Sequence, residues 1–156
     1  MRELPESIRL LRAGATALFL AAWAGAAPAQ FAMVPAPTQL QRASSDADSP
    51  LEYRRDAAKH VYASFPMRIY RGRMPPMLYG IAIVDVQVDT EGNVLDVQIR
   101  RPPAAPEVGP WVLSMIRRAA PFPLPARLGE KVTFSEIWLV DKSGNFQLDT
   151  LTEGQR

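Results

Sequence analysis

The sequence predicts an α+β fold of two layers, in which two helices pack on one face of a small antiparallel β-sheet of three to four strands. Apolar and polar residues alternate over residues 81–89 and 94–100, which is the pattern of half-buried strands. Two segments that begin at Pro50 and Pro110 instead show helical spacing, and residues 130–141 form a long β-branched and aromatic run. The predicted order is therefore helix, strand, strand, helix, strand, with room for one more strand.

The two alternating segments predict a hairpin with one buried face. The connection over residues 89–93 contains Gly92 and Asn93, both of which tolerate a positive φ in a tight turn. The apolar residues predicted to share the buried face are Ala82, Val84, Val86 and Val88 in the first strand and Leu95, Val97 and Ile99 in the second. Antiparallel pairing would place both sets over the same core.

The first helix has a start signal and a stop signal. Ser49 at the N-cap, Pro50 at the first helical position and Glu52 at the third form a capping box with the favoured proline. Pro66 predicts the end, because the residue before a proline is driven out of the helical region. The apolar face predicted for this helix consists of Leu51, Ala58, Val61, Tyr62 and Phe65. His60 lies beside that face, and we expect it to be structural.

The second helix and the third strand complete the predicted layers. The helical spacing is carried by Trp111, Val112, Met115, Ile116 and Ala119. We interpret this stripe as core packed on the sheet rather than as a ligand face. The third strand has Val132, Phe134, Trp138 and Val140 on one face, and Ile137 and Leu139 on the other. Prolines predict extended breaks at residues 101–106 and 120–125 and an irregular segment at 67–79, and residues 146–151 predict a short fourth strand.

The amino terminus has the parts of a secretory signal peptide. A mildly basic start precedes an uncharged, Ala-rich run and a small-x-small cleavage pattern that ends at Ala29. We therefore expect residues 1–29 to be removed by cleavage between Ala29 and Gln30, which places the remainder in the periplasm. The alternative is an uncleaved single-pass anchor in the inner membrane that faces the periplasm, because uncharged residues continue to Gln41.

The exported part divides into three predicted regions. Residues 30–48 mix Pro, Ala, Ser and Gln without periodicity, which predicts a flexible linker. The folded domain is predicted over residues 49–151. A frayed tail is expected at residues 152–156.

Composition excludes several classes of function. The chain of 156 residues has no Cys and one His, which excludes disulfides, Cys-containing zinc sites and thiol nucleophiles and leaves no His-rich metal cluster. A formal net charge of +2 gives no electrostatic case for nucleic acid. We predict no catalytic residues, no cofactor and no metal site. We interpret the local basic spots as solvated surface, with contact to anionic envelope material or an acidic partner as the alternative. These spots are Arg68, Arg71 and Arg73, the pair Arg100-Arg101 and the pair Arg117-Arg118.

Three segments resemble the carboxy-terminal domain of TonB and TolA, the proteins that couple the inner and outer membranes of Gram-negative bacteria. They are VDVQVDTEGNVLDVQI at 84–99, IRRAAPFPLP at 116–125 and VTFSEIWLV at 132–140. The most specific part is the proline-rich exit after a helix that ends in basic residues. The resemblance covers roughly residues 51–150.

The resemblance implies a non-catalytic domain that binds other envelope proteins, often by adding a strand to a sheet edge. An open antiparallel sheet presents unpaired N–H and C=O groups that another extended segment can satisfy. The implied partners are an outer-membrane receptor or a Tol/Pal-type component, with a homodimer as a second arrangement. The candidate edge is residues 132–140, where a strand at 146–151 would pair and block it. No individual partner-binding residue is predicted.

Two other interpretations stay open. The first is an inner-membrane energy transducer held by the uncleaved anchor, although the linker reaches only ~25 Å as a flexible coil. The second is a small periplasmic hydrolase that would use Asp85 and Glu136 as paired acids. We expect both carboxylates at outward positions on their strands, where solvation is the default.

Overall fold

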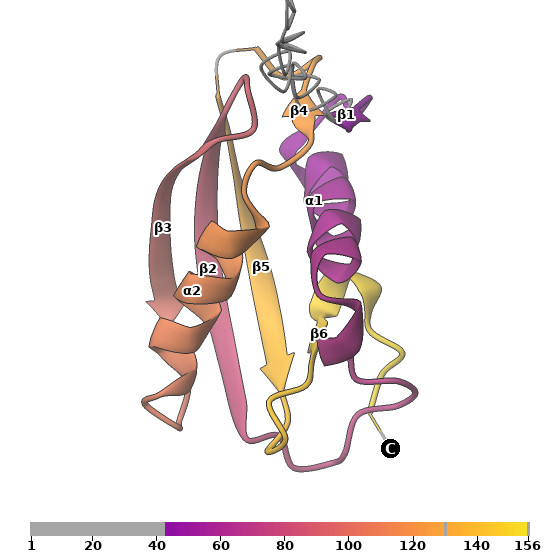
Figure 1. The fold of residues 1–156 in the computed structure, drawn as a ribbon, viewed down its shortest axis with the longest axis vertical. Coiled ribbons are helices and arrows are strands. Elements are labelled where there is room, and N and C mark those ends of the chain that lie inside the picture. Colours follow the sequence, from indigo (N-terminus) through magenta and orange to yellow (C-terminus); the bar gives the residue numbers. More distant parts are fainter. Residues whose placement is uncertain (1–42, 130, 156) are drawn as a thin grey trace, which may run out of the picture. The chain divides into compact units, whose positions relative to one another are not determined.

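The computed structural model describes residues 43–129 and 131–155. The predicted signal peptide, its cleavage site between Ala29 and Gln30 and most of the predicted linker therefore lie outside the described residues. The described part contains helices α1 (Pro50–Ser64) and α2 (Val108–Ala119), with 3₁₀ turns η1 (Pro66–Arg68) and η2 (Asp149–Leu151). The main sheet and both helices form two layers, which confirms the predicted α+β class (Figure 1).

The main sheet has four antiparallel strands in the order β3-β2-β5-β6. These are β2 (Gly80–Asp89), β3 (Val94–Arg101), β5 (Lys131–Val140) and β6 (Phe146–Leu148). The longest pairing joins β2 to β5 over ten residues without a register shift. A separate parallel pair joins β1 (Ser44–Ser45) to β4 (Leu124–Pro125). Both helices lie over the same face of the main sheet (Figure 1).

The core lies between the helices and the sheet, and it contains the predicted face of the hairpin's first strand. Ala82, Val84, Val86 and Val88 are all buried. The second strand agrees only in part, because Leu95 is 53% exposed. The register shifts between Gln87 and Val88, where Val88 pairs with Val94 and leaves Leu95 in a bulge. A bulge reverses the alternation locally, which period-two spacing alone does not reveal.

Helix α1 begins and ends as predicted, but its buried face is rotated. The Ser49 hydroxyl accepts a hydrogen bond from the Glu52 N–H at 3.3 Å. Leu51 is 74% exposed, so its predicted place in the core is wrong. The buried positions are instead Tyr53, Ala57, Ala58 and Val61. Tyr53 takes the core position because its hydroxyl donates to the Pro123 carbonyl at 2.6 Å, which satisfies its polar end.

Two predicted irregular ends are ordered. The prediction of a flexible linker over residues 30–48 is wrong at the end of that range, because Ser44–Ser45 form strand β1. Ser45 is also buried, and its hydroxyl donates to the Asp56 carboxylate at 2.8 Å. The predicted frayed tail 152–156 is wrong over residues 152–155. There the Gly154 carbonyl accepts from Met74 N–H at 2.8 Å. In both cases the order comes from hydrogen bonds to distant segments rather than from local periodicity.

Candidate strand-addition edge

The predicted edge strand, residues 132–140, lies inside the sheet rather than at its margin. One side of β5 pairs with β2 along its whole length. Its other side pairs with β6 only over Trp138–Val140. Within the described residues, the side of β5 facing β6 therefore has no strand partner from Lys131 to Ile137. We call this stretch the β5 free edge.

The direction of the backbone groups on this edge follows from two hydrogen bonds. The Val140 carbonyl accepts from Tyr79 N–H on the β2 side, whereas the Asp141 N–H donates to the Asn145 carbonyl on the β6 side. Because successive residues of an antiparallel strand point to opposite neighbours, odd-numbered residues of β5 point away from β2. The backbone groups of Thr133 and Ser135 thus face the free edge, where no described residue pairs with them.

The free edge ends at an ion pair between the sheet and α1. The Arg54 guanidinium donates to both carboxylate oxygens of Glu136, with Nη2–Oε1 at 2.9 Å and Nε–Oε2 at 3.3 Å. The same Oε1 accepts the Ile137 N–H at 2.9 Å, so this edge donor is already satisfied. The hydrogen bond to Glu136 raises the pKa of Arg54 above its ordinary value. With the Ile137 N–H satisfied, the outward N–H donors left between Lys131 and Glu136 for an incoming strand include those of Thr133 and Ser135.

The free edge carries no charged side chain between Lys131 and Glu136. Thr133 and Ser135 are exposed on the face that the helices leave open. They form side-chain hydrogen bonds to the neighbouring strand β2, namely Thr133 with Gln87 at 3.1 Å and Ser135 with Asp85 at 2.6 Å. These bonds hold the edge in register and leave its backbone groups available.

The opposite margin of the sheet, β3, has features that protect an edge from pairing. Its register against β2 shifts twice, which leaves Leu95 and Arg100 as extra residues. It also exposes the charged side chains of Asp96, Arg100 and Arg101. Bulges and charges are the usual means by which proteins prevent strand addition. The β5 free edge has no bulge, and its charged residues, Lys131 and Glu136, lie towards its two ends, so its middle is the better candidate.

The two acids considered for hydrolysis do not meet. Asp85 pairs with Ser135, and Glu136 pairs with Val84, so the two carboxylates lie on opposite faces of the sheet. The expected outward position of Glu136 is wrong, because this residue is 3% exposed and faces the helices. Asp85 does lie on the open face, where it pairs with Arg100 at 2.9 Å. This separation leaves the pair without the shared cleft that paired-acid chemistry needs.

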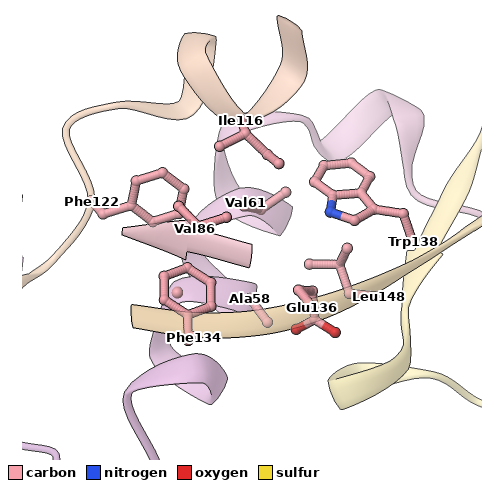
Figure 2. A pocket seen from close by; sticks show the side chains of 10 residues that line it. Ala58, Val61, Val86, Ile116, Phe122, Phe134, Glu136, Trp138 and Leu148 are labelled. Atoms are coloured by element: carbon pink, nitrogen blue, oxygen red, sulfur yellow. The ribbon is translucent and has the colours of Figure 1, made fainter. Parts of the chain in front are cut away.

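The cavity beside Glu136 belongs to the packed core. Figure 2 shows it enclosed by apolar side chains of both helices and the sheet, with the Glu136 carboxylate at its border. Its volume is about 10 Å³, the space of a single water molecule. The indole Nε1 of Trp138 also borders this region and has no hydrogen-bond partner among the described residues. A cavity of this size does not hold a substrate or a cofactor.

The single histidine joins the two helices. His60 Nε2 lies 2.7 Å from the Ala119 carbonyl oxygen, and because a carbonyl only accepts, Nε2 donates. Its ring lies 5.3 Å from that of Phe122. These contacts agree with the structural role expected for it. Among residues 43–129 and 131–155, no group of three acidic or histidine side chains could hold a metal ion.

Comparison with known proteins does not assign a family. No family model, no characterised protein and no solved structure matches the chain. The described residues contain no helix with the length and apolar content needed to cross a bilayer. The geometry of the sheet therefore carries the functional argument. The sequence indicates β5 as the candidate strand, but the pairing of Arg54 with Glu136 has no sequence signal beyond the acid's position between Phe134 and Trp138.

Proposed function

We propose that this is a non-catalytic protein-interaction domain of the periplasm that binds an extended segment of another cell-envelope protein along the β5 free edge. The observation that carries the proposal is the unpaired, uncharged and unbulged stretch at Thr133 and Ser135. An extended segment placed there would continue the sheet by main-chain hydrogen bonds. The resemblance to TonB and TolA supports the same mode and favours an outer-membrane receptor or a Tol/Pal-type component as the partner.

The geometry limits the length of the bound segment. Strand β6 pairs with the edge from Trp138 onward, and the Ile137 N–H already donates to the Glu136 carboxylate. The remaining stretch from Lys131 to Ile137 accommodates about six residues of partner, or roughly 20 Å of strand. We therefore propose a short linear segment as the ligand rather than a folded domain surface.

The edge can be tested by removing one outward N–H. In Ser135→Pro, the ring replaces a hydrogen-bond donor that points away from β2, so the ladder between β2 and β5 keeps all its bonds. Ser135→Ala is the matched control, because it removes the hydroxyl bond to Asp85 but keeps the N–H. Circular dichroism and thermal unfolding would show that both variants are folded.

The readout is capture of partners in cells that express the full chain with a photo-cross-linking residue at Thr133. We expect one or more envelope proteins to be cross-linked to the wild-type and Ser135→Ala chains. Capture by Ser135→Pro should fall at least about tenfold, because a main-chain hydrogen bond is lost and the ring blocks the approach of the strand. Equal capture by folded Ser135→Pro and Ser135→Ala would refute binding at this edge. The intact Met1 in the purified protein would argue against the exported, cleaved form.

A further inference from the structure

The loop between α1 and β2, residues 65–79, presents the most exposed large apolar side chains of the described residues. Met67 is 88% exposed and Met77 is 87% exposed. Single exposed apolar residues are ordinary on a protein surface. Two nearly bare methionines in one loop are a different pattern, because flexible apolar side chains of this kind suit insertion into an adaptable apolar environment.

The same loop carries three exposed arginines without acidic partners. Arg68, Arg71 and Arg73 take part in none of the ion pairs found among the described residues. Residues 65–79 contain no Asp or Glu. The carboxylate that approaches the loop backbone is that of Glu153, which accepts the Gly72 N–H at 3.2 Å. The loop therefore carries three arginines that form no ion pair among the described residues, together with its two exposed methionines.

The backbone of this loop is held in place, although its charged side chains are free. The Tyr70 N–H donates to the Phe146 carbonyl at 2.9 Å, and the Gln147 side chain donates to the carbonyls of Tyr70 and Gly72 at 2.9 and 2.8 Å. Met74, at the middle of the loop, is fully buried. These anchors fix the loop against β6 while the arginines and the two exposed methionines point away from the core. A ligand would meet a surface that is already ordered, which lowers the entropic cost of binding.

The loop lies at the end of the domain opposite to the entry of the chain. Figure 1 shows β1 at one end of α1 and the loop at the other, beside the turn between β5 and β6. Helix α1 has 15 residues, so these ends are about 22 Å apart. The Arg68 side chain lies beside Gly144 in that turn. A Cβ placed on Gly144 would be 3.5 Å from the Arg68 Nη1. The exposed Lys142 of the same turn adds a further cation at this end.

We propose that this loop is an attachment site for an anionic lipid surface, in which Arg68, Arg71 and Arg73 bind lipid phosphates and Met67 and Met77 insert between the headgroups. Arginine is the side chain best suited to phosphate oxygens, and apolar residues beside cations are the composition of interfacial anchors. A stable interface with the surface of a folded protein partner buries at least about 1,200 Å² in total. A fluid bilayer needs no such interface, which favours lipid over an acidic protein at a loop this small.

The lipid-binding proposal does not depend on strand addition at β5, and it is tested by vesicle co-sedimentation of the full-length protein. The vesicles contain phosphatidylglycerol and phosphatidylcholine in one arm and phosphatidylcholine alone in the other. The loop variant combines Arg68→Gln, Arg71→Gln and Arg73→Gln. The control variant combines Arg55→Gln, Arg101→Gln and Arg117→Gln, three exposed arginines on α1, β3 and α2. Both variants have the same net charge and the same amino-terminal segment, so a difference between them reports the loop.

We expect binding of the wild-type chain to phosphatidylglycerol vesicles that weakens in high salt. Each arginine at an anionic surface contributes about fivefold, so the loop variant should bind about 100-fold more weakly, whereas the control variant should stay within about threefold of wild type. A second variant, Met67→Ser with Met77→Ser, keeps the charge of the protein and should bind phosphatidylglycerol vesicles about tenfold more weakly. Both arginine variants losing the same affinity would refute the proposal. Binding of soluble poly-glutamate in place of vesicles would also refute it, since the surface would then serve an acidic protein.

Discussion

Replacement of Gly92 by alanine should destabilise the domain far more than the same replacement at Gly72. Both glycines have a positive φ, +81° at Gly92 and +79° at Gly72. An alanine at either position incurs the left-handed backbone penalty of about 1 kcal/mol. A Cβ at Gly72 would meet nothing within 4 Å, whereas a Cβ at Gly92 would lie 2.0 Å from the Phe122 carbonyl oxygen. Gly72 is therefore a control with matched backbone geometry.

The additional cost at Gly92 follows from what must move. The Phe122 backbone would have to shift by about 1 Å to reach an ordinary contact distance, which would break its N–H bond to the Gly92 carbonyl, now 2.8 Å long. Phe122 is 2% exposed and its ring contacts Phe134 at a centroid distance of 6.1 Å. Loss of the bond and partial loss of this packing add about 2–3 kcal/mol. We expect Gly92→Ala to cost about 3–4 kcal/mol and Gly72→Ala about 1 kcal/mol.

Urea unfolding followed by tryptophan fluorescence measures both free energies. In thermal unfolding, the same free energies correspond to a decrease in Tm of about 15–20 °C for Gly92→Ala and about 5 °C for Gly72→Ala. Equal losses at the two positions would refute the close approach of the hairpin turn to the residue 120–125 crossover. Such a result would leave the positive φ as the remaining reason for a glycine in this turn.

Two further predictions concern the ion pair and the amino-terminal strand. Arg54→Ala leaves the Glu136 carboxylate, whose side chain is 4% exposed, without its cation, so it should lower the free energy of unfolding by about 3 kcal/mol, against about 1 kcal/mol for Glu136→Gln. Urea unfolding measures both, and equal losses would contradict a desolvated pair. The hydrogen bond from the Ser45 hydroxyl holds the pKa of Asp56 below its ordinary value of 3.8. The stabilisation that this bond gives to the folded state is therefore complete above that pH, and it is lost as the pH falls through the lower pKa of the folded state. The destabilisation caused by Ser45→Ala should therefore be constant between about pH 7 and pH 5 and shrink in more acidic solution, and an unchanged difference at about pH 2.5 would contradict it.

The sequence by itself determined the class of fold, the limits of α1 and the buried face of β2. Capping residues and prolines act within a few residues of their own position, and alternation along a strand reports burial directly, so these features are readable without a partner. The sequence also indicated β5 as the strand of interest. It misplaced Leu51 and Leu95, because a helix face and a bulge depend on what packs against them.

Only the tertiary structure decided which backbone groups remain unpaired. The length of β6 leaves Thr133 and Ser135 open, and the bulges of β3 protect the other margin, since both features depend on pairing between distant segments. The burial of Glu136 depends on Arg54, a residue far away in the chain, so a charged residue in a strand could not be assigned to the core in advance. Local pattern therefore determined the elements, whereas the free edge and its limits arise from long-range contacts that no local pattern records.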